Sequence, residues 1–209
     1  MLMLSHIIYS QANTLPIIRD LYHPPEKITI DDYDKKKELL SNLYDKTEIE
    51  LYRPIANNIP AIEAISTKSK VSNYKNHAEI IFGKEKYNFS ITIYVNDKDK
   101  IRQMFISLKT APIATQGATD TYIIRVLNSK FSRTFLHVVE FYSEKKCYFD
   151  HIGLSGLSFL VDDIEEKEGQ IKQLGFRSTG VYHAAPLDFN VCLLYDYNSA
   201  VVELMQIRR

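Results

Sequence analysis

Two glutamates of this 209-residue chain lie inside segments that are otherwise apolar and that predict β-strands. Glu140 lies in TFLHVVEFY, and Glu203 lies in AVVELMQI. A carboxylate is costly to bury in such a strand unless it is paired, hydrated or bound to a metal ion. Three interpretations follow: an ion pair with Arg125 or Arg177 or a wet groove, an acid-base or substrate-binding role, or metal ligation by both glutamates.

Histidine is the side chain best suited to proton transfer near neutral pH. His183 lies on a predicted strand from which it can reach the same site, and we expect it to act as the general base. His137 lies three residues before Glu140, so strand alternation directs it to the opposite face. His151, in FDHIGLSG, lies in a connector, and we interpret both His137 and His151 as structural.

Strand alternation also places hydroxyl groups on the face that carries the two glutamates. This face begins with Ser90 on the predicted strand FSITIYV and with Gly156 on GLSFLV. The opposite faces of both segments are uniformly apolar and should pack beneath helices. We therefore expect a polar cavity with these substrate-binding residues: Ser90, Thr92, Tyr94, Tyr142, Ser158 and Tyr195.

The elements that would position these residues form one unit that occurs twice. Each unit is an apolar strand ending in Val, an Asp-rich turn, an amphipathic helix, two strands and a final strand with the glutamate. The units span about 89–142 and about 156–207, with helices over 97–108 and 163–174. Pairing the two β-α-β-β-β units covers their open edges and apolar faces, which predicts an α+β fold with a cupped mixed sheet over 77–209.

The segments LSFLVDDIEEKEGQIKQLGF and VCLLYDYNSAVVELMQ resemble the vicinal oxygen chelate superfamily. This superfamily includes glyoxalase I, the extradiol dioxygenases, methylmalonyl-CoA epimerase and the bleomycin- and fosfomycin-resistance proteins. The resemblance covers about 89–207. It implies a divalent metal ion held by one residue from each first strand and one from each last strand.

Carried over to this sequence, the last-strand ligands implied by the resemblance are Glu140 and Glu203. The first-strand ligand is usually a His, but here the positions are Ser90 and Gly156. Neither residue replaces an imidazole, so we expect a degenerate metal site and assign no cofactor. A divalent metal is the one cofactor that the resemblance allows.

Residues 1–76 are expected to form an N-terminal α/β extension that packs on the core. SHIIYSQANTLPIIRDLY resembles another first strand and helix of this superfamily, and EIELYRP resembles a last strand. His6 and Glu50 would then be remnants of a further unit. Residues 35–43, however, predict a helix where two strands would be required, so we expect the segment to cover a mouth or an edge of the barrel.

Composition excludes several classes of function. Lys and Arg together number 26, and Asp and Glu together also number 26, so the formal net charge is zero. The basic residues are also dispersed, so neither nucleic acid nor a membrane is an expected partner. Two cysteines without a CxxC pattern, and no signal peptide or spanning segment, suit a cytoplasmic protein. The sequence contains no phosphate-binding Gly-rich loop, no nucleophile elbow and no HExxH.

Three functions remain open for a small-molecule ligand. The first is a metal-free acid-base enzyme of the lyase or isomerase type, with Glu203, Glu140 and His183 as catalytic residues. The second is a non-catalytic binding or resistance protein that holds an antibiotic-like molecule. The third is a metal-dependent lyase or dioxygenase with relocated His ligands. A homodimer is compatible with all three.

Overall fold

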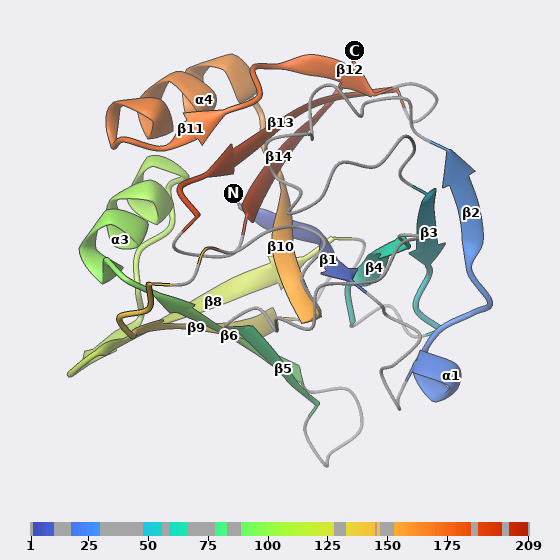
Figure 1. Ribbon diagram of the computed structural model, residues 1–209, viewed down its shortest axis with the longest axis horizontal. Helices are drawn as coiled ribbons and strands as arrows, with labels where there is room; N and C mark the ends of the chain where they lie inside the picture. Colours follow the sequence, from blue (N-terminus) through green and yellow to red (C-terminus); the bar gives the residue numbers. More distant parts are fainter. Residues whose placement is uncertain are drawn as a thin grey trace.

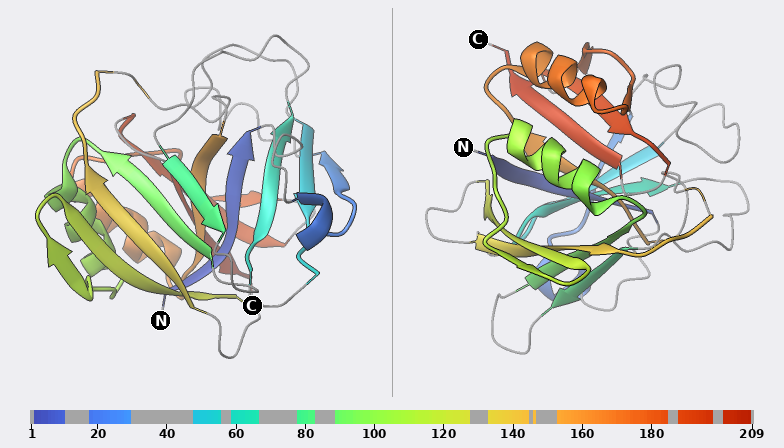
Figure 2. Two further views of the ribbon diagram at one scale, coloured as in Figure 1. Left: turned by 90° about the horizontal axis from the view of Figure 1, so that it is seen from below. Right: turned by 90° about the vertical axis from the view of Figure 1, so that its left-hand side faces the viewer.

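The computed structural model describes residues 2–10, 18–29, 48–55, 59–66, 78–82, 89–127, 133–144, 146, 153–184, 188–197 and 201–208. One mixed β-sheet curves through these residues and carries two longer helices, α3 (Lys98–Ser107) and α4 (Ile164–Gln173). The two helices lie side by side on one flank of the sheet (Figures 1 and 2). None of the described helices has the length and apolar character that crossing a bilayer requires.

Both predicted units are present. The first contains β6 (Phe89–Val95), α3, β7 (Ala114–Gln116), β8 (Thr119–Val126) and β9 (Arg133–Glu140). The second contains β10 (Gly153–Leu160), α4, β11 (Arg177–Ser178), β12 (Tyr182–Ala184), β13 (Phe189–Tyr195) and β14 (Val201–Ile207). In each unit the first strand runs parallel to the last, and the last runs antiparallel to the strand before it. The predicted α+β class is confirmed.

The N-terminal segment contributes a third set of strands in the same order. This set contains β1 (Met3–Ser10), the short α1 (Ile18–Leu21), β2 (Glu26–Thr29), β3 (Glu48–Tyr52) and β4 (Ala61–Ser66). β1 is parallel to β4, β4 is antiparallel to β3, and β3 is antiparallel to β2. EIELYRP therefore supplies the third strand of its set, and the last strand is AIEAIS. The helix predicted over 35–43 lies outside the described residues.

The expected position of the N-terminal segment, at a mouth or an edge, is wrong for β1. This strand pairs antiparallel with β10 along its length, and parallel with β4 and the end of β8. β10 has β14 on one side only, so without β1 its other side would be an unpaired apolar edge. The two predicted units are therefore joined through β1, while β6 pairs on its free side with β5 (Ala78–Phe82).

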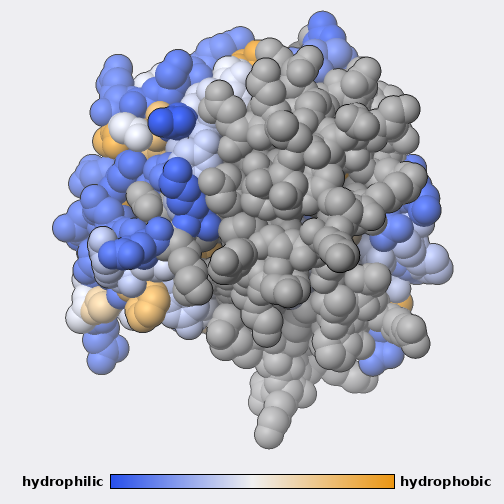
Figure 3. Space-filling view, in the orientation of Figure 1, coloured by the Kyte–Doolittle hydropathy of each residue, from blue (hydrophilic) through white to orange (hydrophobic). Residues whose placement is uncertain are grey.

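Both long helices begin where the sequence predicts. The carboxylates of Asp97 and Asp163 accept hydrogen bonds from the backbone N–H groups of Lys100 and Glu166, which caps each helix. After α4, Gly175 adopts a positive φ of 85°, the left-handed conformation that glycine tolerates at a helix end. Charged and polar side chains cover the outer surfaces of α3 and α4 (Figure 3).

The predicted apolar faces of the first strands lie beneath these helices. Ile91, Ile93 and Val95 from β6, and Leu157 and Phe159 from β10, are buried in one core. The helices complete this core with the following residues: Ile101, Met104, Phe105, Ile164 and Ile171. Because strand side chains alternate, the opposite face of β1, β4, β10 and β14 is free to carry a different kind of site.

Candidate metal centre

Strand pairing brings His6, Glu63 and Glu203 together on the sheet face that points away from the helices. His6 lies on β1 directly opposite Ser158 on β10, and Ser158 lies beside Glu203 on β14. Glu63 lies on β4 beside Ile8 of β1, and Ile8 shares a face with His6. His6, Ser158 and Glu203 therefore lie in one row of the sheet, and Glu63 lies on the same face two residues further along.

The ligand atoms of the three residues converge in a buried space. His6 Nε2 lies 3.0 Å from Glu203 Oε2 and 3.2 Å from Glu63 Oε2, and all three atoms lie within 4.8 Å of one another. The side chains are between 6% and 10% exposed. In the part of the chain that the structure describes, no other group of His, Cys, Asp or Glu side chains has this geometry.

These short distances are those of buried ion pairs whose angles are poor for regular hydrogen bonds. Neither His6 Nε2 nor Glu203 Oε2 has a hydrogen-bond partner, although both atoms are buried. Buried polar atoms are rarely left in this state. On the other side of the ring, Nδ1 of His6 lies 3.3 Å from Ser5 Oγ, a contact that can fix the orientation of the ring.

The separations match the ligand shell of a divalent ion. Two ligands about 2.1 Å from a common ion, at angles between octahedral and tetrahedral, lie about 3.0–3.4 Å apart. One imidazole and two carboxylates suit Mn²⁺, Fe²⁺ or Zn²⁺, and the small number of protein ligands leaves coordination positions open. The three residues therefore fit a metal ion.

The charge of the cluster also favours a cation. Two carboxylates beside one imidazole carry a net charge of −1 if His6 is protonated and −2 if it is neutral. Glu203 forms no ion pair with a lysine or an arginine among the described residues. Burial by itself lowers the pKa of His6, but the adjacent carboxylates outweigh this effect and raise the pKa to about 10. A protonated His6 therefore neutralises only part of the buried charge, whereas a divalent ion neutralises all of it.

Of the residues predicted from the sequence, Glu203 lies in this cluster and Ser158 lies next to it. Ser158 is fully buried, and its hydroxyl donates a hydrogen bond to Met205 Sδ at 3.0 Å. Met205 lies two residues beyond Glu203 on β14 and points to the same face.

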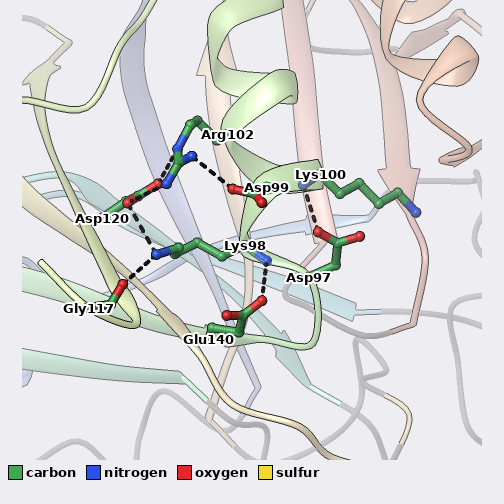
Figure 4. A network of polar contacts seen from close by, with 8 residues as sticks. All are labelled: Asp97, Lys98, Asp99, Lys100, Arg102, Gly117, Asp120 and Glu140. Atoms are coloured by element: carbon green, nitrogen blue, oxygen red, sulfur yellow. Dashed lines mark hydrogen bonds and ion pairs between the residues drawn. The ribbon is translucent and has the colours of Figure 1, made fainter. Parts of the chain in front are cut away.

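The structure places Glu140 elsewhere. Glu140 is the last residue of β9, and its side chain is exposed. Three strands, β8, β1 and β10, lie between β9 and β14 in the sheet. Glu140 Oε1 accepts a hydrogen bond of 3.4 Å from the backbone N–H of Lys98, beside a network centred on Asp120 (Figure 4). Asp120 is fully buried and accepts two hydrogen bonds from Arg102, of 2.7 and 2.9 Å.

The remaining predicted residues are distributed over other strands. His183 is exposed on β12, and Tyr142 is 74% exposed just after β9. Ser90, Thr92 and Tyr94 lie on β6, and Tyr195 is buried on β13 with its ring against Tyr197. None of them belongs to the His6–Glu63–Glu203 cluster. His151 lies outside the described residues.

Sequence reasoning considered His6 together with Glu50 and did not identify Glu63. Glu50 lies on β3, where it accepts a hydrogen bond of 3.0 Å from the Tyr52 hydroxyl. Glu63 lies in AIEAIS, a short apolar strand with a single glutamate. This is the same pattern as in the segments of Glu140 and Glu203, and it would have marked Glu63 as a candidate, although not as a neighbour of His6.

A groove of about 510 Å³ opens close to the cluster, at the edge where β10 and β14 end and β1 begins. Its lining residue Leu160 lies two residues beyond Ser158, which corresponds to about 7 Å along a strand. The groove is lined by Met3, Leu160, Val161, Asp162, Asn190, Gln206, Ile207 and Arg208. Its size is in the range of small-molecule sites.

No model of a protein family matches the sequence, and no curated protein matches it. The chain is similar to solved structures of low sequence identity. A fosfomycin resistance protein, FosX from Listeria monocytogenes, was solved with Mn(II) and sulfate. It is 15% identical, covers 56% of this chain and 86% of its own, and gives a TM-score of 0.43.

Two further structures cover different parts of the chain. A mutant of glyoxalase I from Zea mays is 10% identical over 97% of this chain and 67% of its own, with a TM-score of 0.41. The antibiotic-binding protein TnmS3 from Streptomyces sp. CB03234 is 16% identical over 56% of this chain and 92% of its own, with a TM-score of 0.38. All three similarities are weak, with TM-scores below 0.5.

Proposed function

We propose that this protein binds one divalent metal ion through His6, Glu63 and Glu203 and uses it to hold a small oxygen-bearing molecule for lyase or dioxygenase chemistry. The observation that carries the proposal is the buried convergence of one imidazole nitrogen and two carboxylate oxygens, which leaves the cluster with excess negative charge. This is the metal-dependent alternative that the sequence left open, with His6 as the relocated ligand.

The residues have distinct tasks in this proposal. Glu63 and Glu203 supply the negative charge that holds the ion, and His6 supplies a nitrogen ligand whose orientation Ser5 supports. A bound divalent ion polarises a coordinated oxygen and lowers the pKa of a coordinated water. The nearby groove offers space for the part of the molecule that does not reach the ion.

A metal-free alternative has one observation in its favour. The two carboxylates hold the His6 pKa at about 10, so an imidazolium at neutral pH would form a buried ion triad without any metal. Such a triad would make the cluster structural, and the functions to consider would then be metal-free binding or metal-free acid-base catalysis.

Metal analysis separates these alternatives. Protein purified without chelator and then incubated with Mn²⁺, Fe²⁺, Ni²⁺ or Zn²⁺ should retain about one equivalent of one of these ions. His6→Ala, Glu63→Gln and Glu203→Gln should each lower the affinity at least about 100-fold, because each removes one of only three protein ligands.

Glu140→Gln provides the matched control. Glu140 is also a single glutamate in an apolar strand, but it is exposed and lies apart from the cluster. This variant should retain the ion with unchanged affinity. Loss of metal in Glu140→Gln but not in Glu63→Gln, or no retained metal under any loading, would reject the proposed site.

A further inference from the structure

Ser158 lies in the same row of the sheet as His6 and Glu203, and it stands between them on β10. Ser158 is paired directly with His6 across β1–β10 and with Glu203 across β10–β14. The β-carbons of such directly opposite residues lie about 4.5–5.5 Å apart in an antiparallel pair. The Ser158 side chain therefore borders the space into which the three ligand atoms point, and it is fully buried there.

The orientation of the Ser158 hydroxyl determines what this side chain can offer. A hydroxyl has one proton to donate and two lone pairs with which to accept. The proton is directed at Met205 Sδ, at 3.0 Å. Since the thioether has no proton to donate, a Ser158 hydroxyl that keeps this contact has only its lone pairs left for a neighbour.

We propose that Ser158 accepts a hydrogen bond from the oxygen bound at an open position of the ion, and that Met205 keeps it in this accepting orientation. The site then selects a ligand whose metal-bound oxygen carries a proton, such as an alcohol, over one that binds through a carboxylate or carbonyl oxygen. This inference rests on the proposed metal site and names the class of molecule that the site prefers. Ser158 and Met205 act as specificity-determining residues and not as metal ligands.

Two small chelating anions test this preference on the Mn²⁺-loaded protein. Glycolate presents a hydroxyl and a carboxylate oxygen, whereas oxalate presents two carboxylate oxygens. Their dissociation constants can be measured from the change in water-proton relaxation as each anion displaces Mn²⁺-bound water. The dissociation constant of oxalate divided by that of glycolate then measures the preference for glycolate. This ratio is compared between variants, so the effect of the different charges of the two anions cancels.

Two variants should lower this ratio about tenfold, the value of one hydrogen bond of about 1.4 kcal/mol. Ser158→Ala removes the acceptor. Met205→Leu keeps the side-chain volume but lets the hydroxyl turn and donate to a carboxylate oxygen. Ser155→Ala is the matched control, because Ser155 is buried on the same strand but donates to the Ile8 carbonyl oxygen at 3.2 Å. Mn²⁺ affinity should stay within about threefold of wild type in all three variants.

The outcomes distinguish this inference from the proposed function. A ratio that stays within twofold of wild type in both Ser158→Ala and Met205→Leu overturns the role of Ser158, while the metal site stands. An equal shift in Ser155→Ala overturns it as well, because the effect would then be general. If wild-type protein binds no Mn²⁺ or other divalent ion, the metal site fails and this inference fails with it. Should Ser158→Ala not fold, Met205→Leu alone decides.

Discussion

The imidazole of His6 lies between the carboxylates of Glu63 and Glu203, and the charge on this ring depends on what else is bound. In the metal-free protein, burial lowers the pKa of His6, but the two carboxylates raise it from 6.5 to about 10. A metal ligand must be deprotonated, so the ion and the proton compete for the same nitrogen. One residue thus links the stability of the fold to the state of the site.

We predict that metal-free protein loses stability as the pH rises from 7 to 10. A group whose pKa is raised on folding contributes stability that is complete below its unfolded value and is lost as the pH passes the folded value. Thermal unfolding in chelator should show the melting temperature falling more steeply with pH in wild type than in His6→Gln. Equal slopes for the two proteins would mean that His6 does not carry the extra proton.

A second prediction at this scale concerns Glu63. In metal-free protein, Glu63→Gln removes one of two crowded negative charges, so it should cost little stability. The same change should abolish most of the rise in melting temperature that saturating metal causes in wild type, because binding to the native state alone stabilises it. Thermal unfolding with and without Mn²⁺ measures both effects. A full metal-induced rise in this variant would show that Glu63 is not a ligand.

At the scale of elements, a charged network joins α3 and β8, apart from the His6–Glu63–Glu203 cluster. Arg102 and Lys98 of α3 contact Asp120 of β8 in this network. Burial would raise the pKa of Asp120, but its hydrogen bonds with Arg102 and the nearby Lys98 lower it below the ordinary value. In contrast to the metal cluster, this network pairs its buried carboxylate with cations in hydrogen-bonding geometry (Figure 4).

We predict that Asp120→Asn lowers the free energy of unfolding by about 1.5–3 kcal/mol, because it removes the charge from the acceptor of two hydrogen bonds while the partly exposed Arg102 keeps access to water. Asp99→Asn is the control, since Asp99 contacts the same Arg102 but is 78% exposed, and it should change the free energy by less than about 1 kcal/mol. Urea denaturation at pH 7 measures both. Because the Asp120 pKa is lowered on folding, its contribution should disappear as the pH falls below about 4. Equal effects of the two variants would contradict this assignment.

The elements also show where sequence reasoning succeeded. The helices near 97–108 and 163–174 were predictable because their caps and apolar periodicity are local properties. Glu203 and Ser158 were predictable as neighbours because they lie on strands of one unit. The pairing of β1 with β10 was not, since a hydrogen-bonded ladder between distant strands leaves no local pattern in either of them. His6 and Glu63 depend on that pairing, and so the cluster could not be assembled from sequence.

For the whole molecule, the three sets of strands share one sheet, because β1 pairs with β4 of its own set, with β8 of the first unit and with β10 of the second. We propose that the N-terminal set and the two later units unfold together. Deletion of 1–76 should expose the β10 edge and yield protein that aggregates or binds no metal. Soluble, monomeric material with cooperative unfolding after this deletion would show instead that the segment is an independent extension.

The position of β1 also affects how the chain folds during synthesis. His6 leaves the ribosome 152 residues before its neighbour Ser158 and 197 residues before Glu203. Until Ser158 and Glu203 have been synthesised, β1 carries His6 without these two neighbours. Pairing between strands that are distant in the sequence also slows folding. Binding of the ion would therefore report that both distant parts of the chain have been translated and correctly paired.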